Sequence, residues 1–112
     1  MKRTKIEDLP LWERQVLSLI RHGKANSITV NEIISIIGGT DQSIRGTIRK
    51  LIEKHGYLIG SSNNRATPGF YFPETQEEKK EAVEKMLHRA DDVYKRARVM
   101  SSLPLVNVQD IA

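Results

Sequence analysis

Two helix-start signals separated by a glycine pair constrain the fold of this chain more than any other feature. Thr29 is followed three residues later by Glu32, a spacing typical of a capping box, in which both side chains bond exposed amides at a helix start. Gly38-Gly39 then stops that helix, because glycine takes positive φ without penalty. Thr40 follows as a second cap. The pattern predicts two short helices joined by a sharp turn.

The flanking segments predict the remaining elements. Apolar spacing favours a first helix over about 9–22, with Pro10 in its first turn and Gly23 as its stop. A brief strand is expected over 25–28, and the helix capped by Thr40 should run to about Lys54. Two further strands, 57–60 and 69–72, are joined by the polar loop 61–68. The fold class is therefore mainly α with a small β-hairpin (α+β).

Each of the three helices repeats apolar residues at steps of three and four, which predicts one buried face per helix. These faces contain Trp12, Val16, Leu19 and Ile20; Val30, Ile33, Ile34 and Ile37; and Ile44, Ile48, Leu51 and Ile52. On the third helix the opposite arc carries Gln42, Gly46, Arg49, Lys50 and Glu53. The aromatic residues Trp12, Phe70 and Tyr71 are expected to pack in the core or at the base of the hairpin rather than to stack on bases.

A long helix should close the chain. Thr75 with Glu78 predicts a capping box that opens a helix reaching about Met100. Its apolar residues form a short heptad seam of Val83, Met86, Ala90, Val93, Ala97 and Met100. We expect a basic N-terminal arm at 1–8, a main domain at 9–73, this helix at 74–100 and an extended or disordered tail at 101–112.

Charge and composition restrict the class of protein. The chain of 112 residues has a formal net charge of +4, and residues 1–72 hold eleven basic and six acidic side chains. A basic domain of this size suits a phosphate backbone as partner. The absence of cysteine suits a reducing cytosol, and no apolar stretch reaches the roughly 20 residues of a membrane span. We expect a cytoplasmic protein without a membrane partner.

The order of the expected elements resembles a winged helix-turn-helix domain followed by a long C-terminal helix. The resemblance covers about 9–72 and depends on four segments: Thr29-Val-Asn-Glu32, Gly38-Gly-Thr-Asp-Gln42, Ser43-Ile-Arg-Gly-Thr-Ile-Arg-Lys50 and His55-Gly-Tyr-Leu-Ile59. The wing, ending in Pro68-Gly-Phe-Tyr-Phe72, is also similar to small helix-turn-helix proteins of phage and prophage genomes. The resemblance implies a third helix in the major groove of DNA and a wing near the minor groove.

This resemblance makes the exposed face of the third helix and the wing tip the candidate DNA-binding residues. Arginine and glutamine can read base edges, whereas lysine and the short polar side chains suit phosphate oxygens. The candidates are Thr40, Gln42, Ser43, Arg45, Gly46, Arg49 and Lys50 on the helix, and Asn63, Asn64 and Arg65 in the wing. Alternatively, these charges only solvate the helix, and Asn63-Asn64 only tolerates left-handed turn conformations.

The sequence favours a transcriptional regulator of phage or prophage type that binds double-stranded DNA as a homodimer through the seam of its last helix. The seam could instead pack on the first helix of its own chain. Alternatively, the chain is a replication or recombination accessory, or an adaptor, that binds a partner protein through the last helix or the tail. Lys2, Arg3 and Lys5 could contact DNA or merely solubilise the chain.

Neither a catalytic site nor a cofactor site is predicted. The sequence has no nucleophile-base pair and no glycine-rich phosphate loop, and His22, His55 and His88 are scattered without a second ligand at metal spacing. Asp91-Asp92 is placed for ion pairs with Lys95 and Arg96 rather than for acid-base chemistry. We therefore expect a protein without enzymatic activity, metal or cofactor.

Overall fold

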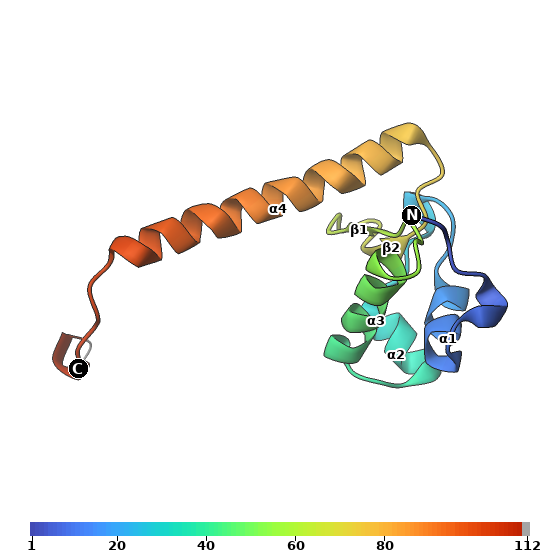
Figure 1. Cartoon of the computed structure of the whole chain (residues 1–112), viewed down its shortest axis with the longest axis horizontal. Coiled ribbons are helices and arrows are strands. Elements are labelled where there is room, and N and C mark those ends of the chain that lie inside the picture. The colour runs from blue at the N-terminus through green and yellow to red at the C-terminus, as the bar shows by residue number, and fades with distance from the viewer. Residues whose placement is uncertain (111–112) are drawn as a thin grey trace. The chain divides into compact units, whose positions relative to one another are not determined.

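The computed structural model describes residues Met1–Asp110, which form two compact units, Met1–Ala82 and a second beginning at Val83. Figure 1 shows α1, α2 and α3 gathered around one end of the chain with the β1-β2 hairpin beside them. The elements are α1 Leu11–Leu19, α2 Val30–Ile37, α3 Asp41–Glu53, β1 Gly60–Ser62, β2 Gly69–Tyr71 and α4 Gln76–Ser102. Short 3-10 turns occupy Ile6–Asp8, Lys24–Asn26 and Val108–Asp110.

The two helix starts predicted from the sequence are confirmed. Thr29 Oγ1 accepts the amide of Glu32 at 3.1 Å, and the Glu32 carboxylate accepts the Thr29 amide in return at 3.1 Å. The Thr29 amide, and then its hydroxyl, bond the Glu32 carboxylate and hold the pKa of Glu32 below its ordinary value. At α3 the box is built from Thr40 and Ser43, whose hydroxyls accept each other's backbone amides at 3.1 and 2.9 Å. Both helices therefore begin where local side chains satisfy their free amides.

The first helix is shorter than its apolar pattern predicts. Pro10 precedes α1 instead of lying in its first turn, and Ile20 is already extended with φ −74° and ψ 133°. Beyond Ile20 the backbone bonds to distant residues, since the Arg21 carbonyl accepts the amide of Phe72 at 2.8 Å. The predicted end at His22 was wrong because these long-range bonds compete with the last helical turn.

The predicted strand over 25–28 is reduced to a single bridging residue. Lys24–Asn26 is a 3-10 turn that follows Gly23, whose φ is +88°. Only Ile28 pairs with the hairpin: its amide donates to the Phe70 carbonyl at 2.9 Å, and the Phe70 amide donates back at 2.7 Å. One residue of the preceding segment is thus held against β2.

The hairpin forms three residues later than predicted on its first side. β1 pairs antiparallel with β2 in the register Gly60 to Tyr71 and Ser62 to Gly69, so Ser61 and Ser62 belong to a strand rather than to the loop. The predicted strand residues Tyr57 and Ile59 are instead buried in the core, at 7% and 8% exposure. The Tyr57 amide donates to the Leu51 carbonyl at 2.9 Å, so this backbone closes the end of α3 and is not available for a strand ladder.

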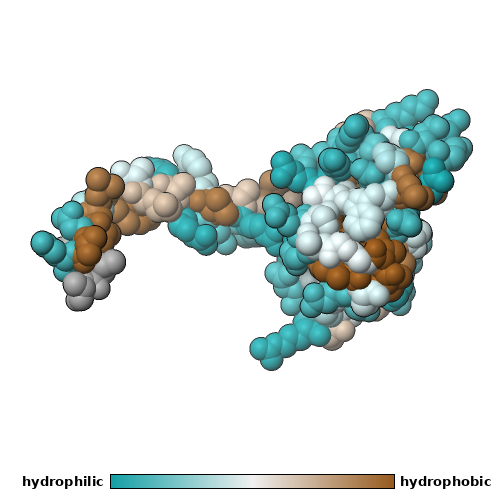
Figure 2. All heavy atoms as spheres, turned by 90° about the horizontal axis from the view of Figure 1, so that it is seen from below, coloured by the Kyte–Doolittle hydropathy of each residue, from teal (hydrophilic) through white to brown (hydrophobic). Residues whose placement is uncertain are grey.

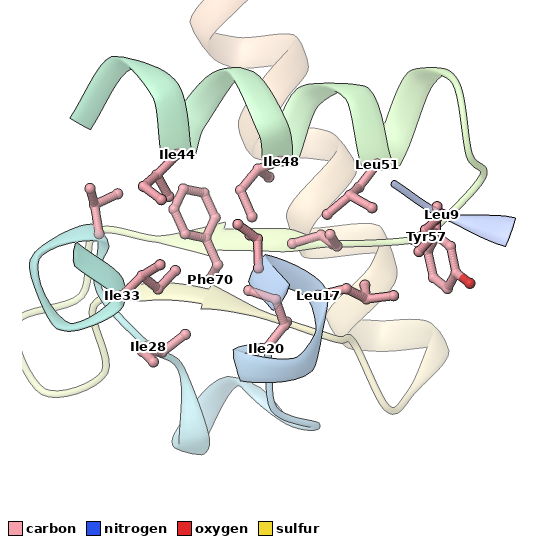
Figure 3. Packing of buried hydrophobic residues seen from close by; sticks show 13 residues of the cluster. Leu9, Leu17, Ile20, Ile28, Ile33, Ile44, Ile48, Leu51, Tyr57 and Phe70 are labelled. Atoms are coloured by element: carbon pink, nitrogen blue, oxygen red, sulfur yellow. The ribbon is translucent and has the colours of Figure 1, made fainter. Parts of the chain in front are cut away.

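The core lies between the inner face of α3 and the elements beneath it. In Figure 3, Ile44, Ile48 and Leu51 point from α3 toward Phe70 and the apolar side chains of α1 and α2. All three are at most 5% exposed, and Tyr71 is 1% exposed. The predicted apolar faces and the core position of the aromatic residues are therefore confirmed, with Trp12, Leu19, Ile34, Ile37 and Ile52 packing on the edge of the core.

The start of α4 is attached to the first unit. Thr75 Oγ1 accepts the Glu78 amide at 3.1 Å, as predicted, but the Glu78 carboxylate accepts the amides of Glu74 and Lys24 instead of that of Thr75. These amides hold the pKa of Glu78 below its ordinary value. Glu81 pairs with the Lys24 ammonium and raises its pKa. The capping box is thus only half formed, because the Glu78 carboxylate bonds the amides of Glu74 and Lys24 and leaves that of Thr75 out.

The second unit has almost no core of its own. Every described residue of α4 from Val83 onward is exposed except the half-buried Lys85. The helix ends two residues beyond the predicted Met100, at Ser102. The tail is irregular apart from the turn at Val108–Asp110, and its last predicted residues, 111–112, lie outside the described part.

Candidate nucleic-acid interface

The outward face of α3 is the most concentrated set of predicted site residues. Ile44, Thr47, Ile48 and Leu51 are buried, whereas Gln42, Ser43, Arg45, Gly46, Arg49 and Lys50 are all exposed. The helix therefore separates a core-facing side from a polar side, as the spacing of its apolar residues predicts. Among the described residues the side chains of Gln42 and Lys50 make no hydrogen bond or ion pair, so both are available to a ligand.

Two basic side chains on this face are oriented by acidic neighbours one turn away. Arg45 Nε lies 2.8 Å from Asp41 Oδ1, and its guanidinium stands 5.8 Å from the centre of the Phe70 ring. Arg49 Nε lies 2.8 Å from Glu53 Oε2, and the Arg49 side chain is 80% exposed. Exposed pairs of this kind are worth at most about 1 kcal/mol, so an anionic ligand could displace either carboxylate at little cost.

Thr40 and Ser43 are fixed by the helix cap. Besides the two capping bonds, the Ser43 hydroxyl donates to the Thr40 carbonyl at 3.0 Å. Both residues are exposed, and the capping bonds hold their hydroxyls in set positions. The start of α3 adds the positive end of a helix dipole to this location.

Gly46 lies at the centre of the exposed face without an internal reason for being glycine. A Cβ built at this position meets no atom within 4 Å, and its backbone is helical rather than left-handed. Glycine nevertheless costs a helix interior about 1 kcal/mol relative to alanine. Packing inside the first unit therefore does not explain why this residue is glycine. The effect of the glycine is to leave the backbone without a side chain at the centre of the outward face.

A hydrogen-bond chain that the sequence did not suggest holds α3 against α1. Trp12 Nε1 donates to Thr47 Oγ1 at 2.8 Å, and the Thr47 hydroxyl donates to the Ser43 carbonyl at 2.8 Å. The bonds connect residues 35 positions apart, so no local pattern could reveal them. They fix the first turns of α3, which carry the candidate side chains.

The tip of the hairpin is a structured turn. The amide of Asn64 donates to Ser62 Oγ, and Asn64 Oδ1 accepts the Ala66 amide at 2.9 Å. No non-glycine residue in the described part has a positive φ, so the left-handed conformation considered for Asn63-Asn64 does not occur. Arg65 is exposed and makes no side-chain bond within residues 1–110.

The N-terminal residues are tied to the domain, which the sequence did not predict. Thr4 donates its amide to the His55 carbonyl at 2.9 Å, and its carbonyl accepts the Tyr57 hydroxyl at 2.6 Å. The His55 ring, 7% exposed, bonds Thr4 Oγ1, so this histidine is buried rather than superficial. Arg3 lies 5.3 Å from the Tyr57 ring centre. Residues 2–5 are thus anchored beside the C-terminal end of α3.

Neither metal-binding nor membrane-spanning features occur in the described residues. Over Met1–Asp110 no three histidine, aspartate or glutamate side chains gather as a metal site would require. In the same range no helix combines the length and apolar character needed to cross a bilayer. Asp91 pairs with Lys95 at 3.0 Å, as the sequence indicates.

The exposed α3 face and the hairpin tip both keep cationic or amide side chains without a partner among the described residues, as do Lys2 and Lys5 near the N-terminus. The seam residues of α4 belong to the second unit and are described separately below. Comparison of the chain with models of known protein families, with curated proteins and with solved structures found no match.

Proposed function

We propose that this chain is a winged-helix protein that binds double-stranded DNA with sequence preference, as a dimeric transcriptional regulator of phage or prophage type acting in the cytoplasm. The order α1, Ile28, α2, α3, β1, β2 supports the winged-helix assignment, because Ile28 pairs with β2 as a third edge of the small sheet. In this proposal α3 enters the major groove and the loop 63–68 approaches the minor groove.

The observation that carries the proposal is Gly46. A helix that needed only to be soluble would gain stability from alanine at this open position. A helix pressed into a groove would gain from the closer approach of its backbone to DNA. Arg45, Arg49 and Lys50 surround this bare backbone with positive charge.

The remaining roles follow from side-chain chemistry. Arg49 and Gln42 can each form two bonds to a base edge, to guanine and adenine respectively. Arg45 and Lys50, with Thr40 and Ser43 at the helix start, suit phosphate oxygens. Asn63, Asn64 and Arg65 form the part of the interface assigned to the wing.

Selection of bound duplexes from a random pool, followed by fluorescence anisotropy on the selected duplex, tests the proposal. Arg49→Ala should cost about 1–3 kcal/mol of binding and relax preference at one base pair, whereas Arg65→Ala should weaken all sequences evenly. Gly46→Ala should bind more weakly although its unfolding midpoint rises. Arg98→Ala, an exposed arginine of α4, is the matched control and should bind as the wild type.

Two results would overturn the assignment. One is a wild-type protein whose duplex binding is absent or insensitive to salt, because phosphate contacts release counterions. The other is unchanged affinity in both Arg49→Ala and Gly46→Ala, since these variants alter the centre of the proposed surface.

A second function is favoured by the apolar residues outside the first unit. Leu105 and Val108 of the tail are 94% and 83% exposed, and α4 carries further exposed apolar side chains. A replication or recombination accessory, or another adaptor, would use them to hold a protein partner. A stoichiometric partner that is lost when 103–112 are deleted, without any duplex binding, would support this function over the first.

A further inference from the structure

The second unit presents an apolar stripe that no described residue covers. Figure 2 shows hydrophobic residues along α4 and the segment that follows it. Val83, Met86, Val93 and Met100 are 45%, 58%, 53% and 64% exposed, and Ala90 and Ala97 are exposed between them. Their spacing of three and four residues places all six on one line of the helix.

The stripe is wider than this line alone. In a heptad frame Val83, Ala90 and Ala97 occupy position a, and Met86, Val93 and Met100 occupy position d. Leu87 and Tyr94, which are 64% and 63% exposed, both fall at position e. The opposite flank, position g, carries Arg89 and Arg96 instead. A partner helix must therefore cover an apolar flank on one side and tolerate arginines on the other.

The sizes of the a and d residues favour an antiparallel second copy. In a parallel pair each residue packs against the same residue of the other copy. Ala90 then faces Ala90 and Met86 faces Met86, so layers of two small side chains alternate with layers of two large ones. In an antiparallel pair position a meets position d. With the helices centred between Asp91 and Asp92, Met86 then meets Ala97 and Ala90 meets Val93, so small and large side chains alternate evenly.

The apolar flank favours the same arrangement. Antiparallel helices bring equivalent e positions together, so Leu87 of one copy packs beside Tyr94 of the other and both lose their exposure to water. A parallel pair would place Tyr94 beside Arg89 instead. On the other flank Arg89 approaches Arg96, and Asp92 lies one turn from each of these arginines on its own helix.

Charge along the helix is complementary in this orientation as well. Residues 83–92 contain three acidic and two basic side chains, whereas residues 93–102 contain three basic and no acidic ones. An antiparallel pair sets the acidic half of one helix against the basic half of the other, and opposes the two helix dipoles favourably.

From these observations we infer that two copies of this chain associate through an antiparallel pairing of α4 over Val83–Met100. The inference deepens the proposed function, in which α4 joins two copies, by specifying the partner, its direction and its register. In this pairing Val83 of one copy lies beside Met100 of the other.

Single-cysteine variants test the direction, because the chain contains no cysteine of its own. Met86→Cys and Ala97→Cys are prepared separately, mixed without DNA and mildly oxidised. The mixture should yield a disulfide-linked dimer that neither variant yields alone. In the antiparallel pair two Met86 positions are about 16 Å apart along the axis, well beyond the roughly 7 Å between Cα atoms that a disulfide permits.

His88→Cys mixed with Lys95→Cys is the matched control. These positions stand at the same height in the antiparallel pair but on its outer face, so they should not cross-link. Cross-linking of Met86→Cys with itself would overturn the direction in favour of a parallel pair. A dimer without the mixed cross-link would overturn the inference alone. A wild-type chain that sediments as a monomer would overturn both the inference and the dimeric state in the proposed function, whereas the proposed DNA-binding surface of α3 would still be tested separately by the duplex-binding assays.

Discussion

The two units differ in how far their apolar side chains are buried. In Met1–Ala82, apolar residues spaced at three and four positions face one another, and Val16, Ile33, Ile44 and Leu51 have no exposed surface. In the second unit the same spacing on α4 leaves Val93 more than half exposed. The spacing of three and four residues occurs in both units, so it predicts which apolar residues share a helix face but not whether that face is covered by the same chain.

The comparison also separates two kinds of polar side chain. In the first unit no described buried side-chain nitrogen or oxygen lacks a hydrogen bond. The outward face of α3 instead leaves Gln42 and Lys50 unbonded. The interior of the first unit thus leaves no described polar side chain unsatisfied, whereas the outward face of α3 holds polar side chains without a partner in the described chain.

Gly69→Ala should cause the largest change, a loss of stability confined to the first unit. Gly69 has a φ of +109°, and an added Cβ would lie 2.1 Å from the Ile28 carbonyl oxygen. The variant should lose about 3 kcal/mol or more of unfolding free energy in the first unit. Urea denaturation monitored by Trp12 fluorescence measures this loss.

Gly46→Ala is the control for that experiment, since its new methyl group meets open space. It should raise the unfolding free energy by about 1 kcal/mol. If Gly69→Ala also abolished association, the assignment of self-association to α4 alone would be contradicted.

A matched pair of valine substitutions should have the next largest effect. Val16 is 0% exposed and Val93 is 53% exposed. Val16→Ala should cost the first unit about 2 kcal/mol, because it removes buried methyl groups and leaves a cavity. Val93→Ala should leave that unfolding free energy unchanged and weaken self-association, as sedimentation over a concentration series would show. Equal destabilisation by both variants would mean that the α4 stripe packs on its own chain.

Trp12→Phe should produce a smaller loss. It removes the donor to Thr47 while Thr47 keeps its bond to the Ser43 carbonyl. We expect a loss of about 1 kcal/mol in thermal or urea unfolding, together with weaker DNA binding because the start of α3 is less firmly held. Unchanged stability would show that the ring packing alone joins α1 to α3.

The smallest effect concerns acid. The Thr29 amide and hydroxyl lower the pKa of Glu32 in the folded chain. The contribution of Glu32 to stability is therefore present above the ordinary glutamate pKa of about 4.3 and is lost as the pH falls through the lower folded value. Glu32→Gln keeps an acceptor but cannot titrate, so its unfolding midpoint should fall less steeply than that of the wild type between about pH 5 and 3. Parallel pH profiles would contradict this role.

Local chemistry in the sequence was enough to predict much of the fold and the composition of the candidate site. The helix starts at Thr29 and Thr40, the apolar face of α3 and its polar arc depend on residues within one or two turns of each other. Caps and periodicity act over that distance, so they can be read from neighbouring residues.

Other features depend on residues distant in sequence, and only the tertiary structure decided them. The early end of α1, the reduction of the strand to Ile28 and the anchoring of Thr4 by His55 and Tyr57 all follow from hydrogen bonds between separate elements. So does the link from Trp12 to Thr47. Each bond forms only after the core has brought its partners together, and for that reason the sequence determined the helices and their faces, whereas packing decided where they end and what holds the candidate surface in place.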